Sequence, residues 1–356
     1  MKRLNLVTGG GGFIGSHVVR QLIRRGEAVR VLDIAGAPDL PQAVEVMKGS
    51  MLEPETLRRA CAGVDRVYHL AADPNLWNRD PDHFHRVNYL GTCRVLDAAV
   101  YRGVERFVHT STESILKSCR RGRAASAMID EGASLSLADM AGPYCRSKFL
   151  AEQAALSAAR SGFPVVVVNP TLPIGAGDRH LNTPSRMLLG FLNGRVRAYI
   201  ECTLNLVDVR DAALAHLRAA DVGQPGERYI LGGENIRMSD LLRLLGQIAG
   251  IAMPRRVPYG VAFAFALANE AVAQLTGRPP AAPLTGVRLV GTESLFDSSK
   301  AVEKLGFPRT PLRDSLTDAI LDFAARGLLR NQLQPAVRKL RQRWVEVPTP
   351  RLAGLR

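Results

Sequence analysis

Tyr144 and Lys148, in the segment GPYCRSKFLAE, have the types and the spacing to move a proton. Residues four apart lie on one face of a helix, so the phenol and the ammonium would lie together. A tyrosine with an ordinary pKa, about 10, is a weak acid or base at neutral pH, and a nearby ammonium lowers that pKa by favouring the phenolate. The pair therefore predicts proton transfer coupled to another step, such as hydride transfer by a nicotinamide.

A group of hydroxyl side chains lies in HTSTES, residues 109–114, at the carboxyl end of the predicted strand RFVHTST, residues 106–112. Ligands of open α/β sheets bind outside the carboxyl ends of the strands. A hydroxyl at that place can polarise the oxygen of a substrate carbonyl or alcohol. The candidates are Thr110, Ser111, Thr112 and Ser114.

The stretch VTGGGGFIGSHVV, residues 7–19, places glycines between a predicted strand and a predicted helix. The spacing Gly9-x-x-Gly12-x-x-Gly15 in this context predicts dinucleotide binding. Such glycines permit a tight turn, a close approach of backbone to a pyrophosphate and close packing of helix on strand. The free N–H groups at the helix start then bind the phosphates. Gly10 and Gly11 are expected to be tolerated extras without a role.

Asp33 ends the next predicted strand, 24 positions after Gly9. A carboxylate there accepts hydrogen bonds from the adenosine ribose hydroxyls and repels a 2′-phosphate. No arginine follows directly in LDIAGAP, so the sequence favours NAD over NADP. The alternative is an aspartate that ends the strand and caps a turn.

Strands and helices alternate through the first 170 residues, which predicts an α/β fold with a doubly wound parallel sheet, the Rossmann fold. Gly26 suits the C-terminal cap of the first helix. The predicted strands are 3–9, 28–34, 65–72, 106–112 and 164–170, and the predicted helices are 14–26, 55–63, 92–103 and 144–162.

The alternation loosens after Pro170. We expect a loop at 171–185 and helices at 186–194 and 238–250, the last with Ser239 as N-cap. A strand and a helix are expected within 204–220, and another strand at 228–233. The predicted organisation is a dinucleotide-binding domain at 1–170, a discontinuous substrate domain at 171–326 with elements at about 204–233 returning to the first domain, and a basic tail at 327–356.

The net charge of +14 favours anionic partners such as nucleic acid, anionic lipid or phosphorylated ligands. The basic segments CRRGR (119–123) and VRKLRQRW (337–344) lack the interleaved aromatics of single-strand binders, so no specific nucleic acid is expected. A solvated basic face is the alternative. The five scattered cysteines and the absence of a signal peptide favour reduced thiols, a cytoplasmic protein and no metal site. Cys145 is expected to be a buried apolar side chain.

Residues 259–275, YGVAFAFALANEAVAQL, are strongly apolar but too short to span a bilayer. One interpretation is a buried helix of the smaller domain. The other is a surface that contacts an anionic membrane or a lipid tail, supported by Arg255, Arg256 and the basic tail. Residues 335–345 of that tail fit a basic amphipathic helix.

The segments TGGGGFIG, HLAA, HTST, YCRSK and VVNP, in this order, resemble the extended short-chain dehydrogenase/reductases over roughly residues 3–326. This branch contains nucleotide-sugar epimerases, dehydratases and dihydroflavonol reductases. The longer segments AADPNLWNRDP, LADMAGPYCRSKFLAEQ, VVNPTLPIGAGD, NLVDVRDAA and RYILGGEN are similar to the hopanoid-associated sugar epimerases. The resemblance implies an NAD(P)-dependent enzyme, a small-molecule, polycyclic or lipid-linked substrate, and a homodimer formed through two helices of the cofactor domain.

The resemblance also implies residue roles. Tyr144 is the catalytic acid/base, Lys148 binds the nicotinamide ribose and tunes Tyr144, and Thr112, where serine is usual, holds the substrate oxygen. The implied cofactor contacts are Gly9, Gly12, Phe13, Ile14 and Gly15 at the pyrophosphate, Asp33 at the ribose, Leu70, Ala71 and Ala72 on the adenine–ribose side, Asn88 in support, and Thr110, Pro170 and Leu172 near the nicotinamide.

One segment departs from the family pattern. The third strand usually ends in Gly-Asp, whereas KGSML places Ser50 at the aspartate position. Adenine recognition would then use the Ser50 hydroxyl and the Met51 backbone. Because an epimerase must retain its cofactor through a full cycle, this departure counts against epimerisation.

The net reaction stays open between epimerisation and ketone reduction of the dihydroflavonol-reductase type, which consumes NADPH. Epimerisation requires that the intermediate turns over or that a second base faces it. His180 and Asp178 are the candidates for that base, against an exposed loop. A non-catalytic NAD(P)-binding scaffold is the third hypothesis, and the presence of Tyr144, Lys148 and Thr112 together argues against it.

Overall fold

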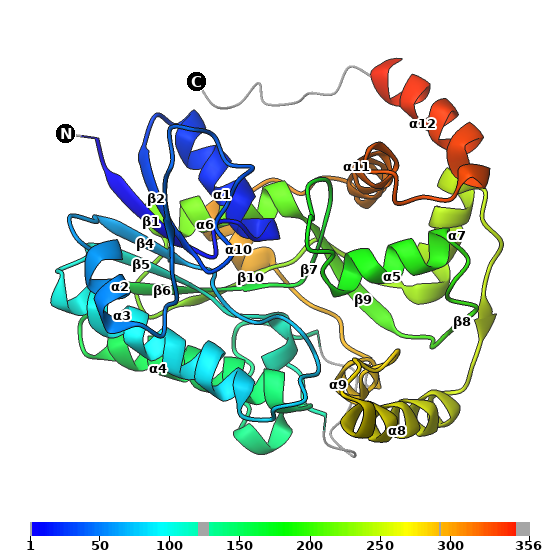
Figure 1. The fold of residues 1–356 in the computed structure, drawn as a ribbon, viewed down its shortest axis with the longest axis horizontal. Coiled ribbons are helices and arrows are strands. Elements are labelled where there is room, and N and C mark those ends of the chain that lie inside the picture. The colour runs from blue at the N-terminus through cyan, green and yellow to red at the C-terminus, as the bar shows by residue number, and fades with distance from the viewer. Residues whose placement is uncertain (1, 120–127, 292, 347–356) are drawn as a thin grey trace.

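The computed structural model describes residues 2–119, 128–291 and 293–346, with the backbone alone at 343–346. Most of the basic segment 119–123 and the end of the tail lie outside the described residues. Seven parallel strands form the central sheet in the order β10-β6-β5-β4-β1-β2-β3 (Figure 1). They are β1 Leu4–Thr8, β2 Ala28–Asp33, β3 Glu45–Lys48, β4 Arg66–His69, β5 Arg106–Thr110, β6 Val165–Pro170 and β10 Arg228–Leu231. The predicted doubly wound α/β fold is confirmed.

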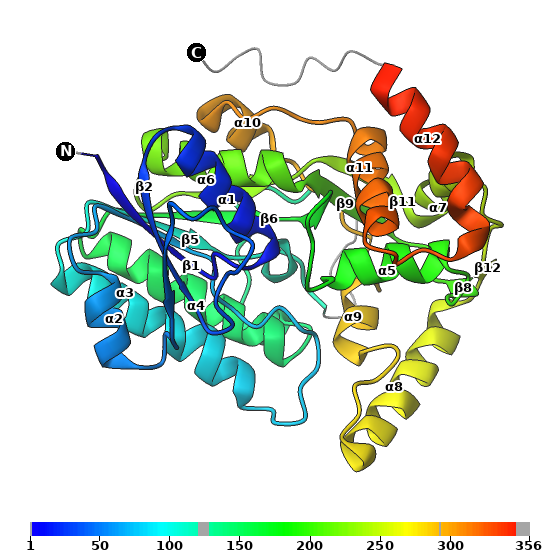
Figure 2. The same cartoon turned by 45° about the horizontal axis from the view of Figure 1, so that its top comes forward.

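Helices cover both faces of this sheet (Figures 1 and 2). One face carries α2 (Pro54–Ala60), α3 (Gly91–Tyr101) and α4 (Pro143–Arg160), and the other carries α1 (Phe13–Arg24), α6 (Val209–Val222) and α10 (Ser299–Leu305). The strands between them are apolar because both of their faces are covered, and all six residues of β6 are buried. Gly26 follows α1 in the left-handed conformation and donates its N–H to Ile23 O, as predicted.

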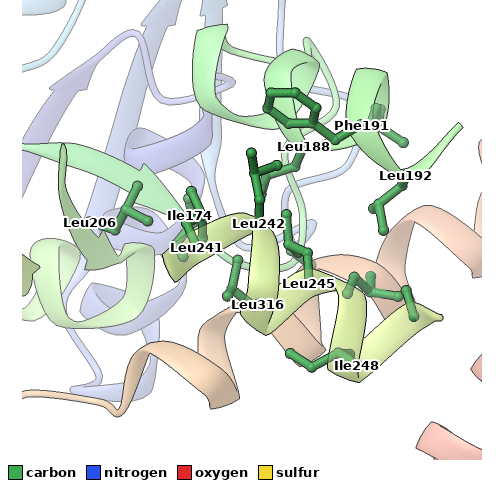
Figure 3. Close-up of a cluster of buried hydrophobic side chains, with 14 of the residues drawn as sticks. Ile174, Leu188, Phe191, Leu192, Leu206, Leu241, Leu242, Leu245, Ile248 and Leu316 are labelled. Carbon is green, nitrogen blue, oxygen red and sulfur yellow. The ribbon is translucent and has the colours of Figure 1, made fainter. Parts of the chain in front are cut away.

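A smaller assembly packs beside the carboxyl ends of the strands. It has a three-stranded sheet, β11-β9-β7, and a two-stranded sheet, β12-β8. Leucines of α7 interdigitate with those of α5 and α11 to form its core (Figure 3). The elements are β7 Leu172–Ile174, α5 Thr183–Leu192, β8 Ala198–Tyr199, β9 Thr203–Asp208, β11 Glu234–Arg237, α7 Met238–Ala249, β12 Arg255–Arg256, α8 Tyr259–Thr276, α9 Leu284–Leu289, α11 Leu312–Ala325 and α12 Gln334–Glu346. Short helical turns are η1 His85–Leu90, η2 Glu113–Ile115, η3 Leu137–Asp139 and η4 Asn331–Leu333.

Elements after residue 170 return to the central sheet. β10 pairs with β6 in parallel, and α6 packs against α1. The sequence reading missed that α10 also joins this layer, against α6 and β10. The division of the chain at residue 170 stays a prediction.

Two local predictions after residue 170 are wrong. The segment 171–185 is not all loop, because Leu172–Ile174 form β7, which pairs in parallel with β9. Ser239 is not the N-cap of α7, because the helix begins at Met238 after Arg237. The carboxylate of Glu201 instead accepts the Ser239 N–H at 3.3 Å, so a distant side chain satisfies this helix start.

Candidate active site

The glycine-rich turn joins β1 to α1 at the carboxyl edge of the sheet. Gly9 has φ +69°, a conformation that L side chains rarely adopt, and its N–H donates to Leu32 O at 2.9 Å. A Cβ at Gly9 would lie 2.8 Å from the Ala71 nitrogen, and one at Gly15 would collide with Gly9 O. The turn, the start of α1 and the end of β4 are therefore in close contact, and the backbone of Leu70 and Ala71 lies beside the turn.

Gly10 and Gly11 are not the tolerated extras that we expected. A Cβ at Gly10 would lie 2.6 Å and 2.8 Å from the two Cγ atoms of the buried Val31. A Cβ at Gly11 would lie 2.8 Å from Gly36 O. Both positions are closed by packing against β2 and the loop after it, so the structure requires glycine at each.

Asp33 caps this turn and keeps room for a further donor. Its Oδ2 accepts the Gly11 N–H and its Oδ1 accepts the Ala35 N–H, each at 3.0 Å. A carboxylate oxygen accepts two hydrogen bonds, and the residue is half-buried, so both oxygens retain capacity. The turn-capping alternative is therefore correct, and it is compatible with a role at the ribose.

The start of α1 fits a phosphate. Gly12 caps the helix without a side-chain hydrogen bond, and the first turn holds no acidic residue. Phe13 and Ile14 are the first two residues of the helix. Their backbone N–H groups therefore lie at its N-terminal end, where the helix dipole is positive. The glycine cradle, this helix end and the Asp33 acceptors together fit a dinucleotide.

Ser50 and Met51 have structural contacts of their own. The Ser50 hydroxyl oxygen accepts the Leu52 N–H at 3.1 Å. The Met51 side chain is buried and packs against Gly91 at the start of α3. Their use in adenine recognition stays a prediction.

Tyr144 and Thr112 face each other at the carboxyl end of β5. Tyr144 is the second residue of α4, and its phenol is in hydrogen-bonding reach of the Thr112 hydroxyl. Thr110 Oγ1 lies 3.0 Å from His216 Nε2, and Ser111 and Ser114 are buried. Thr112 is half-exposed beside the phenol, and its hydroxyl also donates to Ser114 Oγ at 3.1 Å.

Burial raises the pKa of Tyr144 above its ordinary value. The neighbouring Cys145, Glu113 and Asp73 add to the rise in this pKa, and the Thr112 hydrogen bond opposes it. The prediction that Lys148 lowers the pKa of Tyr144 is therefore wrong for the protein alone. The phenol is protonated at neutral pH, which is the form that donates a proton.

Lys148 lies one helical turn further along α4 and is buried. Its ammonium donates to the carbonyl oxygen of Thr110 at 2.7 Å. Burial lowers the pKa of Lys148 to about 8, and the carboxylate of Glu152 opposes that fall. The ammonium is therefore held at the end of β5, with donors left for a ligand.

A polar network behind Lys148 was missed in the sequence. Glu152 is fully buried and accepts from Asn169 Nδ2 at 2.7 Å, and the same amide nitrogen donates to Thr112 O at 3.2 Å. Arg228 of β10 approaches Glu152 to 3.4 Å. The spacing of four between Lys148 and Glu152 on one helix was the available signal. The network joins α4, β6 and the segment that holds Thr112.

Asn88 connects the loop after β4 to α4, and its role in support of the site stays a prediction. Its Oδ1 accepts the Asp73 N–H at 2.7 Å, and its Nδ2 donates to Ser147 Oγ at 3.1 Å. Ser147 Oγ in turn donates to Tyr144 O at 2.7 Å. The start of α4 is thereby fixed to the loop that carries Ala72.

Three fully buried histidines lie under the site. His69 Nδ1 lies 2.8 Å from Thr8 Oγ1, and its Nε2 lies 2.9 Å from Thr92 Oγ1. Burial lowers the pKa of His69 to about 3 and that of His216 to about 4, and it holds the pKa of His109 well below its usual range. All three are neutral at physiological pH.

The remaining predicted positions fall as follows. Pro170 ends β6 in the buried sheet, and Leu172 opens β7 nearby. Asp178 is buried and its Oδ2 accepts the Asn182 N–H at 2.7 Å, while His180 is exposed in the same loop. Cys145 is fully buried, as predicted, and burial raises its thiol pKa to about 11.

Among the described residues, no three His, Cys, Asp or Glu side chains gather as metal ligands. No helix in the same part of the chain is long and apolar enough to cross a membrane.

Residues 5–232 match the model of the NAD dependent epimerase/dehydratase family. The chain belongs to this family. It is an NAD(P)-dependent enzyme of the extended short-chain dehydrogenase/reductase class, as the sequence motifs indicated.

Three relatives align with nearly the whole of this chain. A protein of Synechocystis sp. named after dihydroflavonol 4-reductase is 36% identical over 92% of this chain and 96% of its own length. Sterol demethylase protein B of Methylococcus capsulatus is 31% identical over 91% of this chain and 99% of its own length. A farnesyl-dihydroquinoline-oxide ketoreductase of Stigmatella aurantiaca is 32% identical over 90% of this chain and 96% of its own length.

Solved structures share the fold. The crystal structure of gox2253 superposes with a TM-score of 0.79 at 34% identity, over 92% of this chain and 100% of that one. DesIV, a dTDP-glucose 4,6-dehydratase from Streptomyces venezuelae solved with NAD and TYD bound, has a TM-score of 0.74 at 24% identity, over 92% and 99%. At that identity the likeness to DesIV shows the fold alone.

Proposed function

We propose that this enzyme reduces a ketone to a secondary alcohol, or catalyses the reverse oxidation, with NAD(H) as the hydride carrier. The observation that carries the proposal is the facing pair of hydroxyls, Tyr144 and Thr112, at the sheet edge that also carries the glycine cradle. Reduction needs a proton donor and a hydrogen-bond donor at one oxygen, and these two side chains supply both.

Each residue has a distinct part in this reaction. When bound, the reduced nicotinamide supplies the hydride that adds to the carbonyl carbon. The Tyr144 phenol donates its proton to the carbonyl oxygen, and the Thr112 hydroxyl holds that oxygen by a hydrogen bond. Lys148, fixed on Thr110 O, offers its remaining N–H groups to the nicotinamide ribose. The Asn169–Glu152 network keeps α4 and the Thr112 segment in register.

We propose reduction in place of epimerisation on two grounds. The two candidates for an opposing base do not resemble one, since Asp178 holds the loop before α5 and His180 is exposed. The names of the ketoreductase and dihydroflavonol-reductase relatives support the same reaction class. Epimerisation is the second candidate, supported by the family description.

The coenzyme is proposed to be NAD(H). Asp33 presents carboxylate oxygens beside Gly11, where a 2′-phosphate would meet like charge. The homodimer expected from the family resemblance stays a prediction that light scattering tests.

Deuterium transfer separates the two reactions. The purified protein is incubated with a panel of alkyl and polycyclic ketones and with NADH deuterated at C4 of the nicotinamide, one stereoisomer at a time. A reductase consumes NADH in step with product and places the label on the new carbinol carbon. If no ketone is reduced, and the protein instead inverts the carbinol centre of a single-epimer secondary alcohol with NAD and without net consumption of NADH, the proposal is overturned in favour of epimerisation.

A further inference from the structure

The helix α8 is apolar and stands out from the smaller assembly, at the lower right of Figure 2. Of its 18 residues only Ala266 and Ala273 are buried. Five large side chains are 54% to 85% exposed: Val261, Phe265, Leu267, Val272 and Leu275. The interpretation of this segment as a buried helix is therefore wrong, because apolarity does not reveal whether neighbours cover a helix.

The outward face of α8 is uniformly apolar. Val261, Phe265, Val272 and Leu275 follow the helical spacing of one face. Glu270, the single charged residue of the helix, accepts the Leu284 N–H at 3.0 Å on the inner side. Asn269 Nδ2 and Thr276 Oγ1 donate to carbonyl oxygens of the helix itself. An apolar solvent can therefore cover this face without burying a charge.

Arginines flank both ends of this face. Arg255 and Arg256 are exposed just before α8, and the Arg255 N–H donates to the carbonyl oxygen of Arg197, which is also exposed. Arg278 is exposed just after the helix, and the guanidinium of Arg79 lies beside Gly277. Residues 251–291 contain four arginines and one acidic residue, Glu270. The surroundings of the apolar face are thus cationic at each end.

We propose that α8 lies in the headgroup–acyl boundary of an anionic lipid bilayer, with its apolar face in the lipid and the arginines at both ends on the phosphates. An interfacial helix of this kind combines buried apolar area with attraction to anionic lipid. A second copy of this chain fits the apolar face of α8 less well than a bilayer does. Parallel or antiparallel pairing of two α8 helices brings arginines against arginines at both ends, and like charges oppose such an interface.

The docked helix lies close to the catalytic residues. α9 packs on α8, and Thr285 of α9 leaves no room for a Cβ at Gly142, the residue before α4. Arg288 of α9 donates to Ala141 O at 3.3 Å. Since Tyr144 follows directly, the bilayer surface would lie beside the site. Resting on the proposed function, the substrate class is then an amphiphilic ketone taken from the bilayer.

The basic helix α12 is not part of this surface. Both views place α12 and α8 at opposite ends of the smaller assembly (Figures 1 and 2). Val337 of α12 is buried in the core under α7 and α11. The expectation that the tail supports the apolar helix is therefore wrong for α12, whose exposed Arg338 and Lys339 serve as a control.

The test is co-sedimentation of the full-length protein with vesicles of phosphatidylcholine alone or with about one third phosphatidylglycerol. We expect binding to the anionic vesicles alone, weakened at high salt. Phe265→Asp with Leu275→Asp weakens it by at least about tenfold, and Arg255→Gln with Arg256→Gln by roughly tenfold to thirtyfold. Val100→Asp, at an equally exposed position of α3, and Arg338→Gln with Lys339→Gln leave it unchanged.

NADH binding by each variant reports folding and tests the proposed function separately. Absence of vesicle binding by the wild type, equal binding to neutral vesicles, or binding retained by Phe265→Asp with Leu275→Asp overturns the proposal. A wild-type dimer that ignores vesicles and becomes monomeric in that variant also overturns it, in favour of a second copy on α8.

Discussion

The ammonium of Lys148 lies 2.7 Å from the carbonyl oxygen of Thr110, at the point where β5 ends and the Thr112 segment begins. This contact ties the helix α4, which carries Tyr144, to the edge of the sheet. Burial of the ammonium, and not this hydrogen bond, lowers the pKa of Lys148 to about 8. The contact therefore fixes where the lysine lies, and burial sets its proton affinity.

We expect activity and NADH affinity to fall as the pH rises above about 8. Lys148 loses its charge there, and with it the N–H donors that we propose for the nicotinamide ribose. Fluorescence titrations with NADH from pH 6.5 to 9.5 measure this. Lys148→Met binds NADH more weakly at neutral pH and shows no such fall. A wild-type affinity that is flat to pH 9.5 would contradict this role.

The same lysine shifts stability in the opposite direction. Its pKa is lower in the folded than in the unfolded chain, so the unfolded chain binds more protons between about pH 8 and 10. The contribution of Lys148 to the free energy of unfolding therefore rises with pH across that window, so its deprotonation does not favour unfolding; chemical denaturation at pH 8 and 9.5 measures this.

The proposal that Asp33 selects NADH over NADPH makes a prediction for both coenzymes. Asp33→Asn keeps the shape of the turn but removes the charge that repels a 2′-phosphate and one acceptor oxygen. We expect NADH affinity to fall by about tenfold, the loss of roughly one charge-assisted hydrogen bond, while NADPH affinity holds or rises. Dissociation constants for both nucleotides measure the ratio. Tighter wild-type binding of NADPH than of NADH is the contrary outcome.

Gly10→Ala destabilises the protein by about 1–3 kcal/mol, because the new methyl overlaps the Val31 side chain. Gly260→Ala is the matched control, since a Cβ there meets nothing within 4 Å and the helix α8 gains stability. Chemical denaturation measures both. Val31→Ala removes the side chain that the new methyl overlaps. It therefore lowers the free energy of unfolding less in the Gly10→Ala background than in the wild type. Additive effects of the two substitutions would exclude the overlap as the cause.

The buried histidines make the protein acid-sensitive. His69 and His216 have folded-state pKa values of about 3 and 4, below the ordinary value near 6.5, so the unfolded chain binds more protons between those limits. The free energy of unfolding has its full value above about pH 6.5, and each of these histidines lowers it by roughly 1–2 kcal/mol by pH 5. Thermal melts from pH 7 to 5 measure it. His216→Gln reduces the slope, whereas His180→Gln, at an exposed position, does not; equal slopes would reject this cause.

The sequence predicted the parts of the fold that local pattern controls. The strand before Gly9, the helix after Gly12 and the spacing of Tyr144 and Lys148 are all local, and the structure brings them to one sheet edge. The closed space at Gly10 depends on Val31, a neighbour across the sheet, so no local pattern could show it.

The missed features depend on residues far along the chain. Glu201 caps α7 from 38 positions away, and β7 exists because β9 pairs with it. Burial, not a neighbouring ammonium, controls the pKa of Tyr144. The exposure of α8 likewise depends on what packs against it and not on its composition.

The substitution Tyr144→Phe tests the central claim most directly. Once a ketone substrate is identified by NADH oxidation, the rate of this variant is compared with that of the wild type, alongside its NADH affinity. If the phenol is the proton donor, as we propose, the rate falls by at least about a hundredfold while the NADH affinity is unchanged. A rate within a few-fold of the wild type, in a variant that still binds NADH, would contradict the assignment of this site.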